Sequence, residues 1–515
     1  DGLGQVLLYP YYTARGGNDT LISVVNTTSA GKAVKVRFIE ALNSREVLDF
    51  NIYLSEFDVW TAAITDLEAL DLGDGPGILT TDQTCTTPYF FGDRSGVQEF
   101  VDFGYNSAPV ESLNFDGTID GGPSGIERAA SGHFEIIEMG TIDDDSDVGG
   151  WITHDAGVPA DCASVVDLWR TPPSGAPAPA AGELGFWRLG DDTFGFDLDA
   201  GLTGGLFGAA SIINVNNGTM FTYNATAVDA FFADTTPEFH TAPEAVTPSL
   251  NGGTNRVSNV FANGSVETID WFSTPGSGSV PFPLNAALTL SELMNEYTLN
   301  AVNGGTTEWV LTFPTKRFHT DAAPGGPRFA SGTAVEPFTE VWTQDAPFAC
   351  EEQTFKFWDR EENVPVDEPG DPGGVGVSPP GPPTEDPAER GFVLCRETNV
   401  IRFANDGSEP DATEILAEPF RADADDSIVG DADELSYTNL NLPEGFNSGW
   451  VKFDFTGFES RAGSPIAGVS DTVVGFPVIG FSANTFTNGA LPNGTLSNYG
   501  GTFKHRGTRQ SAVGN

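Results

Sequence analysis

The chain has 515 residues and carries 73 acidic against 24 basic side chains, which gives a formal net charge of −49 at pH 7. A surface of that sign repels nucleic acids and anionic lipid headgroups within the reach of ionic screening, which argues against polynucleotide binding. Hydrophobic residues form 39% of the chain, including 38 Phe and 9 Trp. The sequence therefore has enough apolar material for packed cores, and global disorder is excluded.

Period-two alternation predicts β-strands along the first half of the chain. Val34, Val36 and Phe38 alternate with Lys35 and Arg37, which predicts a strand with one buried face. The same pattern predicts strands at 5–12, 20–26 and 50–54. A hairpin is predicted at 211–223, turning at Asn217-Gly218, because Asn-Gly suits the two central positions of a tight hairpin turn.

Further strands are predicted at 308–313, 354–358, 399–403, 450–455 and 473–481. Short helices are expected only at 64–72 and at 290–297, whose sequence is LSELMNEY. With 61 Gly and 35 Pro, turns are frequent. Many short strands separated by turns predict an all-β chain of two or three antiparallel β-sandwich (Ig-like) domains with long Gly/Pro/Asp-rich loops.

A chain of this length is too long for one core, so we expect several domains. We predict an N-terminal β-sandwich at 1–235 with an irregular insertion at about 66–183, a second β-rich domain at 236–349, and a C-terminal β-rich domain at 350–515. The last contains a Pro/Gly-rich loop at 363–391, which is either a solvated loop or a contact arm toward a neighbouring subunit.

The start at Asp1 rather than Met predicts that a signal peptide has been removed. No apolar stretch approaches the roughly 18 residues of a transmembrane helix. We therefore expect an extracellular protein of a bacterial cell surface. Four cysteines in an exported chain predict two disulfides. Of three possible pairings, Cys85–Cys162 and Cys350–Cys395 are favoured, because each closes a loop within one predicted domain.

Two acidic clusters are candidate calcium sites, since calcium takes six to eight oxygen ligands and loops dense in Asp supply them. The alternative is a pair of solvated acidic loops, because neither cluster matches the EF-hand pattern. The first cluster consists of Asp143, Asp144, Asp145 and Asp147, and the second of Asp423, Asp425, Asp426, Asp431 and Asp433.

The sequence offers no catalytic motif. There is no H-E-x-x-H and no G-x-S-x-G, and the five His residues are scattered. Paired carboxylates of the glycosidase type have no specific support among 73 acidic residues. We expect a protein that is not an enzyme, with no catalytic residues and no cofactor other than calcium.

The C-terminus is basic, with Lys504, Arg506 and Arg509 close together. On a chain of net charge −49, such a segment has two candidate partners: the acidic surface of another copy, and an anionic surface polysaccharide. The alternative is a frayed terminus without a partner.

Several stretches resemble a family of exported, largely uncharacterised proteobacterial surface proteins of the S-layer type. They are VLLYPYYT, GNDTLISVVNTT, MNEYTLN, EWVLTFPTKRF, FPVIGFSANTFTNG and LSNYGGTFKHR. The resemblance covers most of the chain and implies export, and it assigns no site residues.

These observations predict a structural, self-assembling extracellular surface protein: an S-layer, sheath or filament subunit, stabilised by calcium or high salt. The main alternative is a calcium-dependent adhesin or a polysaccharide-binding secreted protein. A secreted hydrolase is the third.

Overall fold

A computed structural model describes residues 2–92, 95–106, 122–189, 198–199, 201–233, 239–271, 280–299, 304–320, 334–342, 349–363, 390–405, 412–419, 439–462, 471–490 and 496–512. Strands account for 49% of the structure and helices for 10%. The sheets are antiparallel apart from one parallel strand pair. The predicted all-β, antiparallel class is therefore confirmed.

Two large sheets are built mainly from the first half of the chain. Their strands are β1 (Val6–Thr13), β2 (Asn18–Asn26), β3 (Gly31–Glu40), β4 (Glu46–Leu54), β5 (Val59–Asp66), β6 (Pro76–Leu79), β7 (Cys85–Thr87), β8 (Val97–Glu99), β9 (Ser131–Ile142), β12 (Leu198–Asp199), β13 (Leu206–Asn214), β14 (Thr219–Asn224) and β15 (Thr226–Val228). Sheet A has the order β14-β13-β2-β5-β6-β8, and sheet B the order β15-β1-β9-β3-β4-β7, with β12 beside β9. The two sheets share one apolar core, which includes Trp60 and Ile64 from sheet A and Phe38 and Phe134 from sheet B.

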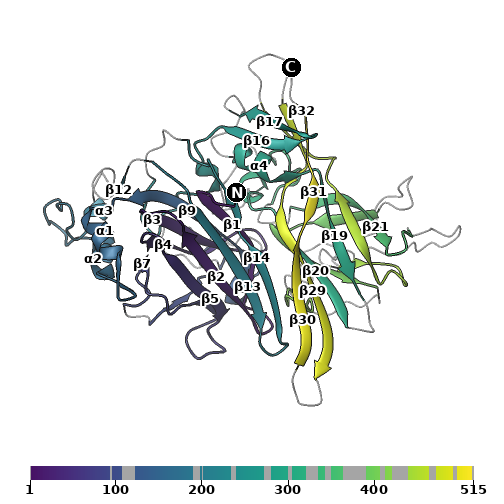
Figure 1. Cartoon of the computed structure of the whole chain (residues 1–515), viewed down its shortest axis with the longest axis horizontal. Coiled ribbons are helices and arrows are strands. Elements are labelled where there is room, and N and C mark those ends of the chain that lie inside the picture. The colour runs from purple at the N-terminus through teal and green to yellow at the C-terminus, as the bar shows by residue number, and fades with distance from the viewer. Residues whose placement is uncertain are drawn as a thin grey trace.

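Two further sheets form the other side of the molecule (Figure 1). Their strands are β19 (Glu292–Thr298), β20 (Gly305–Thr312), β21 (Glu351–Asp359), β22 (Arg390–Leu394), β23 (Thr398–Ala404), β24 (Asn439–Asn441), β25 (Ser448–Asp454), β29 (Ile479–Ala490), β30 (Leu496–Lys504) and β31 (Arg506–Thr508). Sheet F has the order β22-β21-β25-β19-β31, and sheet G the order β24-β23-β20-β29-β30. A Phe-rich core lies between them, with Phe355 and Phe453 facing Trp309 and Phe403. Strands from both sides of the predicted boundary at 349/350 thus share these sheets.

Smaller elements complete the fold. One is a three-stranded sheet of β26 (Glu459–Ala462), β27 (Asp471–Val474) and β32 (Gln510–Ala512). The two-stranded pairs are β10 (His154–Asp155) with β11 (Val158–Pro159), β16 (Val257–Ala262) with β17 (Ser265–Asp270), and β18 (Thr289–Leu290) with β28 (Phe476–Pro477). The helices are α1 (Asp147–Ile152), α2 (Cys162–Trp169), α3 (Phe186–Leu189), α4 (Phe282–Leu288) and α5 (Arg317–Thr320). The side chain of Asp161 caps α2 by accepting a hydrogen bond from the Ser164 backbone nitrogen. None of the helices within the described ranges has the length and apolarity needed to cross a bilayer.

The Ig-like part of the fold prediction is wrong. In Ig-like sandwiches each sheet has one solvent face, whereas every residue of β1, β3, β9 and β23 is buried here. In β1, Leu7 and Tyr9 enter the core shared with sheet A, while Val6 and Leu8 enter a second core on the opposite face. The sheets instead form a five-bladed, β-propeller-like arrangement.

Most predicted strands are present, but both predicted helices are wrong. Residues 292–297 belong to β19, because Leu293 and Tyr297 satisfy strand alternation as well as the i, i+4 helix pattern and are buried in the core between sheets F and G. Residues 64–72 continue β5 to Asp66 and then turn. The hairpin of β13 and β14 is confirmed, with Gly218 at φ 65° in its turn. The range 66–183, expected to be irregular, contains the 12-residue strand β9.

Candidate functional site

The basic C-terminal segment is folded, so a frayed terminus is excluded for residues 496–512. β30 pairs with β29, β31 with β19, and β32 with β27. The His505 side chain is buried, and its Nε2 lies 3.0 Å from the Val310 carbonyl oxygen. The flanking Lys504 and Arg506 are exposed. The basic side chains of Lys504 in β30 and Arg506 in β31 thus lie toward solvent.

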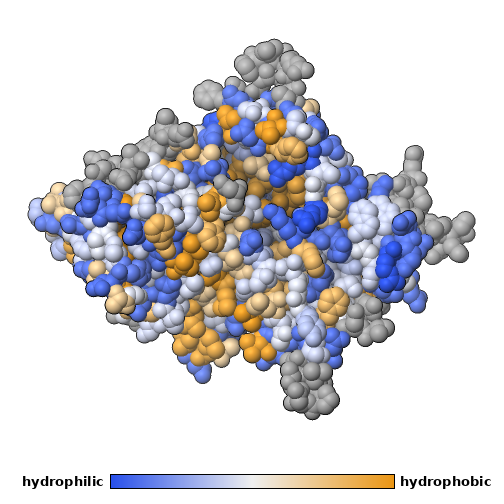
Figure 2. Space-filling model, in the orientation of Figure 1, coloured by the Kyte–Doolittle hydropathy of each residue, from blue (hydrophilic) through white to orange (hydrophobic). Residues whose placement is uncertain are grey.

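A groove of about 840 Å³ runs beside this segment. Lys504, Arg506 and Arg509 line it together with residues 222–229. Among the described residues that line it, Asp229 is the one acidic residue. Figure 2 shows the hollow next to β31. The Arg509 guanidinium donates a 2.8 Å hydrogen bond to the Ala287 carbonyl, and burial lowers the pKa of Arg509. Three cations predicted from the sequence are therefore brought to one concave site.

The outward face of sheet A is a second candidate site. Its exposed or half-buried side chains are apolar or carry hydroxyl groups across four neighbouring strands, and we name it the uncharged face: Leu21, Ser23 and Val25 of β2, Val59, Thr61 and Ala63 of β5, Phe207, Ala209, Ser211 and Ile213 of β13, and Met220 and Thr222 of β14. Leu21, Val59, Phe207 and Met220 are 41–51% exposed. Among the described residues, Asp19, Asp66 and Asp82 carry charge at its border, and Asp82 Oδ2 accepts hydrogen bonds from the backbone nitrogen and the hydroxyl group of Thr61. Apolar surface over β2, β5 and β13 is visible in Figure 2.

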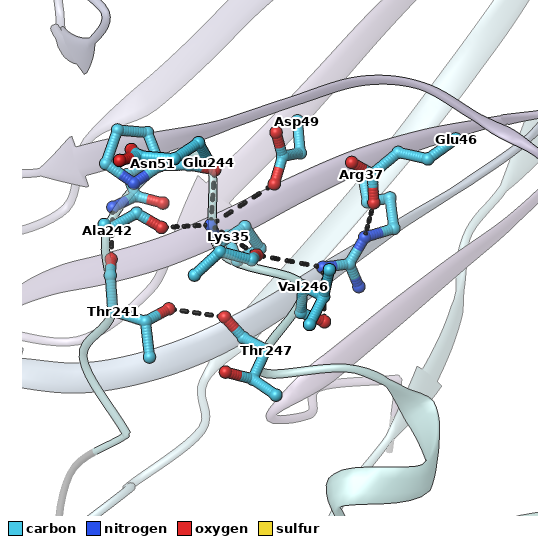
Figure 3. Close-up of polar contacts among 12 residues, drawn as sticks. Lys35, Arg37, Glu46, Asp49, Asn51, Thr241, Ala242, Glu244, Val246 and Thr247 are labelled. Atoms are coloured by element: carbon cyan, nitrogen blue, oxygen red, sulfur yellow. Dashed lines mark hydrogen bonds and ion pairs between the residues drawn. The ribbon is translucent and has the colours of Figure 1, made fainter. Parts of the chain in front are cut away.

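The polar face of β3, expected to meet solvent, is instead buried beneath residues 239–250 (Figure 3). Lys35 Nζ donates to the carbonyl oxygens of Ala242 and Pro243, each at 2.7 Å, and lies 3.5 Å from Asp49 Oδ2. Arg37 donates to the Val246 carbonyl at 3.0 Å and pairs with Glu135 at 2.7 Å. Burial lowers the pKa of Lys35 to about 8 and raises that of Asp49 to about 7. This network holds the covering segment against sheet B.

Another buried cluster joins sheet B to the second half of the chain. Arg317 Nη2 lies 3.0 Å from Glu135, and Arg317 Nη1 lies 3.6 Å from Glu397, which is also 3.5 Å from His133. Burial raises the pKa of Glu397 to about 8 and lowers that of His133. The cavity beside Arg317 and Glu397 holds only about 10 Å³. A histidine and a carboxylate in contact suggest acid–base chemistry, but no substrate could reach this pair.

Ser55, His154 and Asp58 also come together, although no sequence motif indicates it. Ser55 Oγ lies 3.1 Å from His154 Nδ1, and Asp58 Oδ2 lies 4.0 Å from the same nitrogen. A catalytic triad uses opposite ring nitrogens for the nucleophile and the carboxylate. Because both groups contact Nδ1, the imidazole cannot relay a proton between them.

The first acidic cluster spans the loop before α1 and, with Asp147, the first residue of that helix, and Ser146 is the helix cap. Asp143 Oδ1 accepts a hydrogen bond from the Asp145 backbone, and Asp144 Oδ1 accepts one from Gly31 N. Among the residues that the structure describes, no three His, Cys, Asp or Glu side chains come together in a way that could hold a metal ion. The second cluster, 423–433, lies outside the described residues, as does most of the Pro/Gly-rich loop at 363–391. Calcium binding stays a prediction.

Both predicted disulfides are confirmed. Cys85 of β7 is bonded to Cys162 at the start of α2, and Cys350 is bonded to Cys395. They span 77 and 45 residues of sequence. The first attaches the α1–α2 region to sheet B, and the second joins the segments that lead into β21 and away from β22.

Comparisons with protein-family models, with curated proteins and with solved structures find no match to this chain. The resemblance to exported surface proteins therefore stays a prediction. Inferences about function depend on the surfaces and sites described above.

Proposed function

We propose that the protein is an exported structural surface protein that self-assembles, and that the uncharged face of sheet A is a contact between copies. One observation carries the proposal: across four strands the outward side chains of this face are themselves uncharged, with Asp19, Asp66 and Asp82 at its edges, on a chain of net charge −49. Copies with so high a charge repel one another, and the repulsion is weakest where the approaching surfaces carry no charge. Burial of the exposed Leu21, Val59, Phe207 and Met220 adds hydrophobic stabilisation.

A face that contacts its own copy makes a twofold interface, in which the same patch serves both subunits. A larger assembly needs another contact, and it also needs screening of the acidic surface by salt or by divalent cations such as calcium. Sheet, sheath and filament remain open under this proposal. Two disulfides suit an extracellular location.

The test uses sedimentation velocity and negative-stain microscopy on the purified chain across a salt series, with calcium and with chelator at equal ionic strength. Leu21→Glu with Phe207→Glu is expected to abolish association. The matched control is Phe261→Glu with Val266→Glu, a cross-strand pair 65% and 64% exposed on the β16–β17 hairpin, and it is expected to associate like the wild type. A wild-type chain that stays monomeric in every condition would overturn the structural function. Association lost in the control pair but kept in the Leu21/Phe207 pair would overturn the assignment of the face.

A further inference from the structure

We infer that the groove beside β31 is a binding site for an anionic polysaccharide. The sign of its charge is the first argument. Three of the chain's 24 basic residues line the groove, whereas Asp229 is the one acidic residue among the described residues that line it. Over the whole chain, by contrast, acidic residues outnumber basic residues threefold. Among the described residues, no carboxylate pairs with Lys504 or Arg506. A local excess of positive charge in a concave site attracts an anionic ligand at short range, within the Debye length.

The spacing of the cations suits a polymer better than a small anion. Lys504 and Arg506 flank the buried His505 on an extended chain, which places their Cα atoms roughly 7 Å apart. Arg509 extends the row to the end of the groove next to Ala287. Charges distributed along a groove of about 840 Å³ match acidic groups repeated along a chain.

The rest of the lining matches sugar chemistry. Thr222, Asn224 and Thr226 also line the groove, where hydroxyl and amide groups can donate to and accept from sugar hydroxyls. A second pocket of about 170 Å³ shares Val228, Asp229 and Ala287 with the groove. Three asparagines, Asn251, Asn255 and Asn259, line this pocket together with Asp229, Arg256, Ser258 and several apolar side chains. Amides beside apolar side chains are a suitable lining for a sugar ring.

Two other polyanions fit less well. An acidic peptide can gain affinity by adding a strand to a sheet edge. Of the edge strands at the groove, β15 and β31 have only three residues each, and the edges of β14 and β30 already contact each other, because the Thr502 hydroxyl donates a hydrogen bond to the Thr222 carbonyl. A single-stranded nucleic acid needs exposed aromatic rings for base stacking. The aromatic residues that line the groove, Tyr223 and Phe481, are 8% and 2% exposed.

The experiment measures binding of the dispersed full-length chain to immobilised polygalacturonate, dextran sulfate, neutral dextran and poly-L-glutamate by biolayer interferometry. The carboxylated and sulfated polymers separate the two acidic groups that the cations could recognise. Lys504→Ala with Arg506→Ala is expected to weaken polysaccharide binding by about tenfold or more and to reduce its salt dependence. Lys504→Arg with Arg506→Lys should retain binding. Arg170→Ala with Arg360→Ala removes two exposed cations elsewhere and should leave the affinity within about twofold.

Thermal unfolding of each variant checks that the fold is kept. Binding of either acidic polysaccharide that depends on Lys504 and Arg506, with no binding of neutral dextran, is the expected result. The proposal fails if neither acidic polysaccharide binds, if the control pair loses affinity equally, or if poly-L-glutamate binds more tightly through the same residues. Because the chain is dispersed in this assay, these outcomes are independent of self-assembly.

Discussion

Lys35 Nζ lies 3.5 Å from Asp49 Oδ2 beneath the segment 239–250, where two backbone carbonyls also accept hydrogen bonds from it. The pair joins β3 to β4 on a face of sheet B that the alternation pattern places in solvent. Desolvation therefore acts on both charges. The carboxylate is harder to ionise, and the ammonium group is harder to protonate, than in water.

This burial predicts a pH-dependent stability. The pKa of Asp49 is about 7 in the fold, above its ordinary value of 3.8. Protonated Asp49 therefore stabilises the fold, and the contribution is complete below the ordinary value and lost as pH rises through about 7. The Asp49→Asn variant has no titrating group at this position. The difference in free energy of unfolding, variant minus wild type, should therefore rise between about pH 4 and about pH 7. Urea unfolding at several pH values measures the difference, with exposed Asp155→Asn as control. A pH-independent difference would contradict this assignment.

The buried carboxylate of Glu308 binds the loop that contains Ile415 and Leu416. Its Oε1 and Oε2 accept hydrogen bonds from Ile415 N at 2.6 Å and Leu416 N at 2.9 Å. Glutamine offers only one acceptor oxygen, so Glu308→Gln leaves one buried N–H without its partner, at a cost of about 1–3 kcal/mol. Urea unfolding should show that loss, and amide exchange at Ile415 and Leu416 should quicken. Glu414→Gln, a half-exposed site in the same loop, is the control and should change both little.

The disulfides predict a stability loss that depends on loop length. Cys85–Cys162 closes 77 residues, so Cys85→Ala with Cys162→Ala should lower the free energy of unfolding by roughly 4 kcal/mol. Cys350–Cys395 closes 45 residues and should cost slightly less when removed. Equilibrium unfolding of both double variants tests the order. A larger loss from the shorter loop would contradict the chain-entropy account for this protein.

Much of the fold could be predicted from sequence, because alternation marks strands directly. The strands at Val34–Phe38 and at 399–403 and the hairpin turn at Asn217-Gly218 are examples. What could not be predicted is which face each strand buries. Lys35 Nζ donates a hydrogen bond to the backbone carbonyl of Ala242, which lies 207 residues later in the sequence. A contact to a backbone carbonyl leaves no side-chain pattern from which it could be predicted.

The candidate site shows the same limit. Lys504, Arg506 and Arg509 could be identified as an unusual basic segment on an acidic chain. Residues 222–229, which line the same groove, lie more than half the chain away in sequence, and tertiary packing of β14 against β30 brings them near. The uncharged face of sheet A also needed the register of four strands, since its residues are individually unremarkable in the sequence.

The most direct test of self-assembly through the uncharged face is the oxidation rate of Met220 by hydroxyl radicals, read by mass spectrometry. Met220 is 51% exposed on this face, and Phe261, at 65% on the β16–β17 hairpin, is the internal reference. Assembly in screening salt is predicted to slow Met220 oxidation several-fold relative to the dispersed chain and to leave Phe261 unchanged. Assembly that protects Phe261 while Met220 stays as reactive as in the dispersed chain would contradict the account.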